Sequence, residues 1–227
     1  MIKNLESKIV GSLAGMIASE RAVNEDTPSS KEAIDIARLI CQSATPEALL
    51  MKMPPSSWAR SSSASVIGLV FHDRLGDMLD FCRTETLFSS PASQCAALGT
   101  AVLISSACFD VPMGIWPNEI GGILRGVDNY MVTLINDATV ASMGPEIELD
   151  FFKRMNAKAD PDTAILVLSL FSCLRGRTFD LACNVSKAAG PQVACLTGAV
   201  MGAAFPKPTD DPIIADLAKM LLARRIP

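Results

Sequence analysis

Histidine, aromatic residues and charge are all scarce in this chain of 227 residues. His72 is the only histidine, aromatic residues make up 5% of the chain and charged residues 19%. A net charge of -4, without a basic stripe or interleaved aromatics, argues against nucleic-acid binding. Any Cys–His or Ser–His catalytic pair would have to use His72, and no G-x-S-x-G turn marks a nucleophile. We therefore interpret His72 as a structural residue on a helix.

Paired cysteines and long apolar runs are also missing. The seven cysteines are scattered singly, without a CxxC pair, which favours reduced thiols in a cytoplasmic protein. The run Val193–Phe205 is shorter than the roughly 20 apolar residues that a membrane span needs. Glu6 and Lys8 interrupt the N-terminal segment, so no export signal is expected. The sequence predicts no membrane span.

The abundant residues are aliphatic. Hydrophobic residues make up 49% of the chain and the mean hydropathy is +0.32. They are mainly Ala, Leu, Ile, Val and Met, which favour packed helices over a β-sandwich. No strand-length run alternates with period two. We predict an all-α fold, a single compact orthogonal bundle of about nine or ten helices in one domain over residues 1–227.

The spacing of apolar residues and the positions of cap residues predict where the helices lie. The Ser-rich segment Ser56–Val66 is expected to be an exposed loop. Expected caps are Ser29 or Ser30, Ser90, Asp162 and Asp211. The main expected ranges are Lys3–Arg21, Lys31–Ala44, Glu47–Met53, Ala64–Cys82 as one or two helices, Ser89–Cys108, Ile120–Asn136, Glu146–Lys158, Asp162–Leu174, Phe179–Ser186, Val193–Phe205 and Ile213–Arg225.

Two of these helices carry small residues at helical spacing. Gly11 and Gly15 lie four residues apart near the N-terminus. Ala194, Gly198 and Gly202 repeat the same spacing near the C-terminus. Because such ridges lack bulky side chains, each helix is expected to let a neighbouring helix approach closely.

Three segments resemble, in order, parts of the ADP-ribosylglycohydrolase family. KIVGSLAGMIASERA resembles its first helix, SSPASQCAALGTAVLISSAC its Ala-rich middle helix, and TFDLACNVSKAAGPQVACLTGAVMGAAF its closing signature. FPKP takes the place of the family's Tyr-Gly…Pro exit. The resemblance implies a helical fold in which two Mg²⁺ or Mn²⁺ ions orient ADP-ribose and activate a water. A T-D-D-T motif and a D-x-D-T turn would hold those ions.

The metal motifs of that family are eroded here. Ala189, Pro191 and Gln192 stand where the D-x-D-T turn has two aspartates and a threonine. Hard cations need several oxygen ligands, so no metal ligand and no catalytic residue is assigned. Asn24-Glu25-Asp26-Thr27 is an imperfect match to T-D-D-T. Glu25 and Asp26 are therefore kept only as candidates for lining an inherited cleft.

Two other acidic clusters lie outside the family's motif positions. Asp160-Pro161-Asp162-Thr163 spells D-x-D-T, and we interpret it as a helix cap in which Asp162 accepts from first-turn N–H groups. As an alternative, it supplies displaced metal ligands. Thr209-Asp210-Asp211 is interpreted as a cap before Pro212, and otherwise as a relocated T-D-D.

Three functional hypotheses follow. In the first, the protein is a pseudoenzyme that needs no cofactor and binds a protein partner, a second copy of itself, or an ADP-ribose-like small molecule. In the second, Glu25 and Asp26, with or without Asp160 and Asp162, form a rebuilt Mg²⁺ or Mn²⁺ hydrolase site, which requires these carboxylates to converge. In the third, the chain is a purely structural scaffold, which the absence of a cleft near the start of Val193–Phe205 would support.

Overall fold

The computed structural model describes residues 4–26, 28–42, 61–82 and 90–223. These residues contain helices and no strand, which confirms the all-α prediction. They form 12 α-helices, more than the nine or ten predicted. The predicted helix Glu47–Met53 lies outside the described residues.

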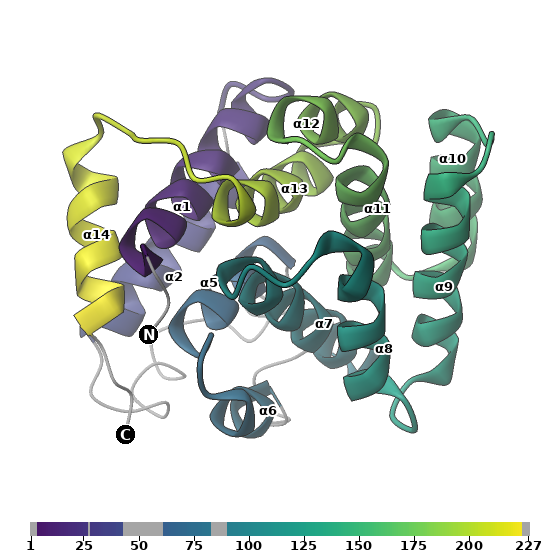
Figure 1. The fold of residues 1–227 in the computed structure, drawn as a ribbon, viewed down its shortest axis with the longest axis horizontal. Coiled ribbons are helices and arrows are strands. Elements are labelled where there is room, and N and C mark those ends of the chain that lie inside the picture. Colours follow the sequence, from purple (N-terminus) through teal and green to yellow (C-terminus); the bar gives the residue numbers. More distant parts are fainter. Residues whose placement is uncertain (1–3, 27, 43–60, 83–89, 224–227) are drawn as a thin grey trace.

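The helices are ordered along the chain as shown in Figure 1. They are α1 (Leu5–Arg21), α2 (Pro28–Gln42), α5 (Ser61–Val70), α6 (Leu75–Cys82), α7 (Pro91–Cys108), the 3-10 turn η2 (Met113–Ile115), α8 (Trp116–Leu124), α9 (Asn129–Met143), α10 (Glu148–Lys158), α11 (Pro161–Gly176), α12 (Phe179–Lys187), α13 (Pro191–Ala204) and α14 (Pro212–Ala223).

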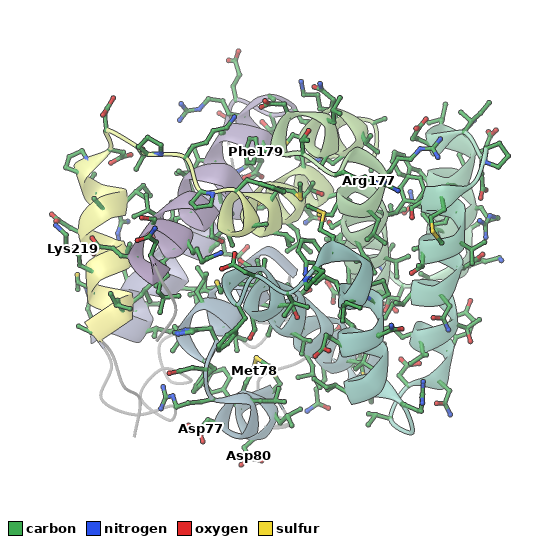
Figure 2. The ribbon with its side chains drawn as sticks, viewed as in Figure 1. Asp77, Met78, Asp80, Arg177, Phe179 and Lys219 are labelled. Atoms are coloured by element: carbon green, nitrogen blue, oxygen red, sulfur yellow. The ribbon has the colours of Figure 1, made fainter. Side chains whose placement is uncertain are left out.

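Helices α7, α11 and α13 form the centre and are buried along almost their whole lengths. Helix α1 packs along α13, α5 along α7, and α9 along α11. Figure 1 shows α9 and α10 at one edge and α14, beside α1, at the other. The peripheral helices are amphipathic: in α6, Met78 is buried while Asp77 and Asp80 point outward (Figure 2).

The glycine ridges of α1 and α13 face each other. A Cβ on Gly11 would overlap the carbonyl oxygen of Gly202, and a Cβ on Gly15 would overlap that of Gly198. The predicted close approach is therefore confirmed, and the two ridges are each other's partners. This contact positions the start of α13 beside the end of α1.

The predicted helix Ile120–Asn136 is wrong, because α8 ends at Leu124 and α9 begins at Asn129. Gly126 has a φ of 84°, a left-handed conformation that glycine adopts without steric cost. Asp128 then accepts a hydrogen bond from the Met131 N–H at 2.8 Å and caps α9. Val127, which a continuous helix over Ile120–Asn136 would have placed on its apolar face, lies in the turn and is 63% exposed.

The Ser-rich segment also differs from its prediction. Helix α5 already begins at Ser61, so the C-terminal half of the expected loop Ser56–Val66 is helical. Its residues from Ala64 to Val70 are buried against neighbouring helices. Burial on all sides explains why this segment shows no amphipathic pattern.

One described helix, α7, is long and apolar enough to cross a membrane by length and composition. Its 18 residues have a mean hydropathy of 1.2, and 78% of the helix is buried inside the protein. Its apolar surface is thus already covered by neighbouring helices. No disulfide links the seven cysteines, which all lie in the described part of the chain, and all except Cys41 are buried.

Candidate functional site

Three helices begin around one cavity of about 380 Å³. Each starts with a proline: Pro28 in α2, Pro161 in α11 and Pro191 in α13. Proline suits this position because its fixed φ fits the first helical turn and its missing N–H needs no acceptor. The cavity lies at the start of Val193–Phe205, where the binding hypotheses place a cleft. The absence of a cleft there would have supported the third hypothesis.

Buried Glu20 holds the start of α2. Its side chain is 0% exposed, and its oxygens accept hydrogen bonds from the Ser29 N–H at 2.9 Å and the Ser30 N–H at 2.7 Å. The Ser30 hydroxyl donates to the same carboxylate at 2.6 Å. The predicted capping by Ser29 or Ser30 is therefore wrong. Both serines lie within the first turn of α2, and a carboxylate from α1 satisfies their N–H groups.

Sequence reasoning gave Glu20 no role. A signal was present, because Glu20 continues the inward spacing of Ile9, Leu13 and Met16 on α1. It also lies in the last turn of its own helix, where the helix dipole disfavours a carboxylate. An acidic residue at a buried helical position, near a negative helix end, indicates a partner from another element.

Asp160, and not Asp162, caps α11. Asp160 Oδ1 accepts a hydrogen bond from the Thr163 N–H at 3.1 Å. Asp162 lies inside the first turn and accepts from the Ser93 hydroxyl of α7 at 2.7 Å. The sequence prediction had chosen the wrong aspartate of the pair because it began the helix one residue late. Asp160 thus caps the start of α11, and Asp162 binds a hydroxyl in the first turn of α7.

Helix α13 begins without such a carboxylate. Its N-cap residue is Gly190, which forms no side-chain cap hydrogen bond. The first-turn N–H groups of Gln192 and Val193 have no acceptor within the helix. Both residues line the cavity. The positive end of the α13 dipole is therefore directed at this space.

Glu25 and Asp26 lie exposed in the turn before α2. The Asp26 N–H donates to Asn24 Oδ1 at 3.1 Å. Neither acidic residue is among those that line the cavity, whereas Pro28 and Ser29 are. Thr27 lies outside the described residues. The assignment of Glu25 and Asp26 to a cleft stays a prediction.

The described residues do not fit a two-metal centre. Across residues 4–26, 28–42, 61–82 and 90–223, no group of three or more His, Cys, Asp or Glu side chains is placed to hold a metal ion. Asp211, from the other acidic cluster, accepts from the Ile213 N–H at 2.9 Å and the Ile214 N–H at 3.4 Å, which confirms its role as the α14 cap. That cap lies beyond the opposite end of α13.

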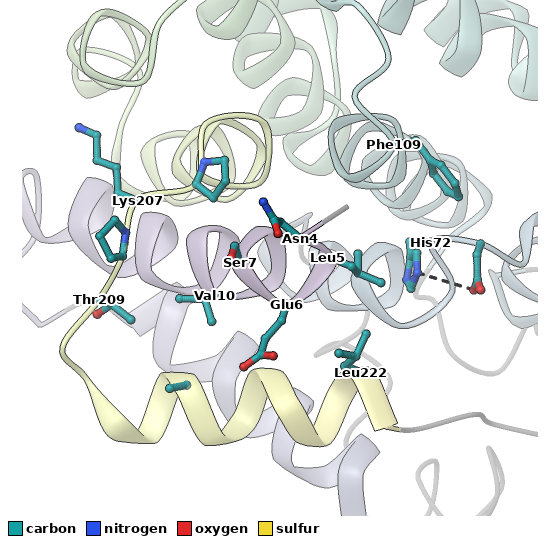
Figure 3. A pocket seen from close by; sticks show the side chains of 14 residues that line it. Asn4, Leu5, Glu6, Ser7, Val10, His72, Phe109, Lys207, Thr209 and Leu222 are labelled. Carbon is teal, nitrogen blue, oxygen red and sulfur yellow. Dashed lines mark ion pairs between the residues drawn. The ribbon is translucent and has the colours of Figure 1, made fainter. Parts of the chain in front are cut away.

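Another cavity, of about 960 Å³, has His72 at one end (Figure 3). His72 Nδ1 lies 2.8 Å from the Leu69 carbonyl oxygen, and Nε2 lies 3.8 Å from Asp73 Oδ1. Because a carbonyl only accepts, Nδ1 carries the proton in that contact. The ring is thus used to hold the end of α5. Ser105, the nearby hydroxyl, donates to the His72 carbonyl and not to the ring.

No protein-family model matches this chain, and no curated protein matches it.

Proposed function

We infer that this protein resembles the ADP-ribosylglycohydrolases but is a non-catalytic binding protein. It binds ADP-ribose or a similar nucleotide without a metal ion. The proposed site is the cavity at the starts of α2, α11 and α13. Its volume of about 380 Å³ is within the range of small-molecule sites, roughly 300–1,000 Å³. The proposal rests on the sequence resemblance for the identity of the ligand.

One observation carries the proposal: α13 opens into this cavity, and its N-cap residue Gly190 forms no side-chain cap hydrogen bond. Free first-turn N–H groups and the helix dipole together form a natural site for phosphate oxygens. The neighbouring helix starts are already satisfied by Glu20 and Asp160. An incoming phosphate would therefore find its donors on α13.

Catalysis is not expected, because the cavity offers N–H hydrogen-bond donors, which bind an anion, and its described lining residues include no carboxylate that would bind a metal cation. Ala189, Pro191 and Gln192 line the space where the family's second signature would supply carboxylates. A cluster of hard oxygen ligands is what a Mg²⁺ or Mn²⁺ pair requires. The second hypothesis would need Glu25 and Asp26 to join Asp160 and Asp162, each of which already accepts a hydrogen bond.

Calorimetric titration of ADP-ribose, with and without Mn²⁺, tests the proposal. We expect metal-independent binding that is lost in Ala189→Phe, which would fill the cavity. Ala157→Phe is the matched control, since Ala157 is exposed on α10 and does not line the cavity. Binding only with Mn²⁺ would overturn the proposal in favour of a hydrolase.

Absence of binding under both conditions would also overturn the proposal. The scaffold hypothesis would then stand, and a protein partner or a second copy of the chain would be sought. The first surface to test would be the exposed apolar side chains Val140, Met143 and Ile147 at the α9 edge. Multi-angle light scattering of the purified protein reports its oligomeric state directly.

A further inference from the structure

A separate cavity of about 510 Å³ lies over the seam between α1 and α13. It shares no lining residue with the cavity at the start of α13. The segment from Phe205 to Asp211, which leads from α13 to α14, borders it together with the first turn of α14. Its volume is again typical of a small-molecule site.

The walls of this cavity are apolar and partly aromatic. Phe179 of α12 and Phe205 at the end of α13 contribute rings, and Ile17 and Ile214 contribute aliphatic side chains. Close packing of α1 on α13 leaves only backbone and small side chains such as Ala14 beneath these walls. A lining of aromatic rings, aliphatic side chains and small residues suits a flat apolar group.

The charged rim of the cavity is positive. Arg21, at the end of α1, is exposed and forms no ion pair with any residue in the described part of the chain. Lys207 lies 4.8 Å from the centre of the Phe179 ring and 3.2 Å from Asp180 Oδ1. That ion pair is loose, because the two side chains are 61% and 79% exposed.

The acidic residue on the rim does not cancel this charge. Asp211 lines the cavity, but its carboxylate accepts from the first-turn N–H groups of α14. The positive end of that helix therefore balances it. Arg21 and Lys207 remain as cations beside an apolar hollow.

We propose that this cavity binds a small aromatic acid, with its ring system between Phe179 and Phe205 and its acidic group near Arg21 and Lys207. Apolar burial supplies most of the affinity, and the two cations select an anion over a neutral analogue. This site is independent of the proposed nucleotide site. Its failure would leave ADP-ribose binding unaffected, and the reverse also holds.

Two fluorescent probes that differ in one charged group test the proposal. Anilinonaphthalene sulfonate carries a flat aromatic body and a sulfonate, and N-phenyl-1-naphthylamine has the same body without the charge. We expect saturable binding of the sulfonate at one site, tighter than that of the neutral probe. Equal affinity for both probes would overturn the assignment of an acidic ligand.

Two variants locate the binding. Ala14→Phe should fill the hollow and lower sulfonate affinity at least tenfold, whereas Ala157→Phe, away from the cavity, should not.

Arg21→Gln should weaken sulfonate binding by about two- to fivefold, the value of one exposed ion pair, and leave the neutral probe unchanged. Lys219→Gln, an exposed α14 lysine that lines none of the described cavities, is its control. Unchanged binding in both Ala14→Phe and Arg21→Gln would overturn the site. Because Arg21 is exposed, its variant stays informative even if Ala14→Phe does not fold.

Discussion

Gly15 and Gly198 occupy each other's missing side-chain space. The Cβ that Gly15 lacks would overlap the carbonyl oxygen of Gly198, and the Cβ that Gly198 lacks would overlap the carbonyl oxygen of Gly15. Gly11 and Gly202 repeat this reciprocal contact one turn away. The backbones of α1 and α13 are thus in direct contact, and no side chain could relax to admit a larger residue.

Substituting Gly15 by alanine should destabilise the protein by about 3 kcal/mol. Alanine favours a helix over glycine by about 0.5–1 kcal/mol, but backbone overlap with Gly198 outweighs this gain. The midpoint of urea unfolding measures the difference. Gly122→Ala is the control, since Gly122 is an exposed residue of α8 with nothing within 4 Å of its Cβ position. It should be neutral or slightly stabilising, and equal losses in both variants would contradict the packing argument.

Replacing Glu20 by glutamine should cost about 2 kcal/mol, because hydrogen bonds to a charged acceptor are replaced by weaker or repulsive contacts. The amide keeps one acceptor oxygen but directs an NH₂ group at the N–H groups of Ser29 or Ser30. The loss should appear in urea unfolding and as faster hydrogen exchange at the start of α2. Glu25→Gln, in the exposed turn nearby, should change stability by less than about 0.5 kcal/mol. Similar exchange rates in the two variants would show that Glu20 does not hold α2.

The sequence predicted the helical class and the close approach of α1 and α13 because both depend on local spacing. The spacing of Gly11 and Gly15, and of Gly198 and Gly202, indicates that another helix can approach closely. It does not indicate which helix does so. The boundary between α8 and α9 was missed for the opposite reason. Apolar residues continue at helical spacing across Gly126 and hide the turn, which the structure shows in the left-handed φ of Gly126 and in the Asp128 cap.

The candidate site was harder to predict than the fold. The helix starts at Pro161 and Pro191 carry readable signals, but their meeting with Pro28 depends on packing between segments far apart in the chain. The role of Glu20 depends on the same packing. The resemblance directed attention to the start of α13, where the structure has a cavity, and to Glu25 and Asp26, which do not line it.

Buried thiols should make the protein sensitive to alkali. Burial raises the pKa of the Cys82 and Cys108 thiols from 9.0 to about 12. Above pH 9 the unfolded chain releases these protons while the folded protein keeps them, so stability falls as pH rises from 9 towards 12. Each such thiol contributes a slope of about 1.4 kcal/mol per pH unit.

Urea unfolding between pH 8 and 11 measures this slope in the wild type and in Cys108→Ala. The variant starts from a lower stability but should lose stability less steeply, by the slope of one thiol. The other buried thiols are present in both proteins, so the difference between the two slopes is assigned to Cys108 and its immediate charged neighbours. Identical slopes would mean that the thiol ionises as easily in the folded protein as in the unfolded chain.

Lys8 ties α1 to the ends of two central helices, and its loss should be costly. The side chain is 4% exposed, and Nζ lies 3.3 Å from the Ala107 carbonyl oxygen of α7 and 3.4 Å from the Ala203 carbonyl oxygen of α13. Both carbonyls belong to C-terminal turns, where the helix dipole favours a cation. Asp110 accepts from the same ammonium at 2.5 Å.

Lys8→Met keeps the apolar stem but leaves two buried carbonyls without this donor, so a loss of about 2 kcal/mol is expected in urea unfolding. Lys219→Met, which breaks an exposed pair with Asp216 on α14, should cost less than about 0.5 kcal/mol. High salt should abolish the small effect at Lys219 and leave most of the effect at Lys8, because buried contacts are poorly screened. A loss at Lys8 that disappears in salt would show that its ammonium is solvated and does not join the three helices.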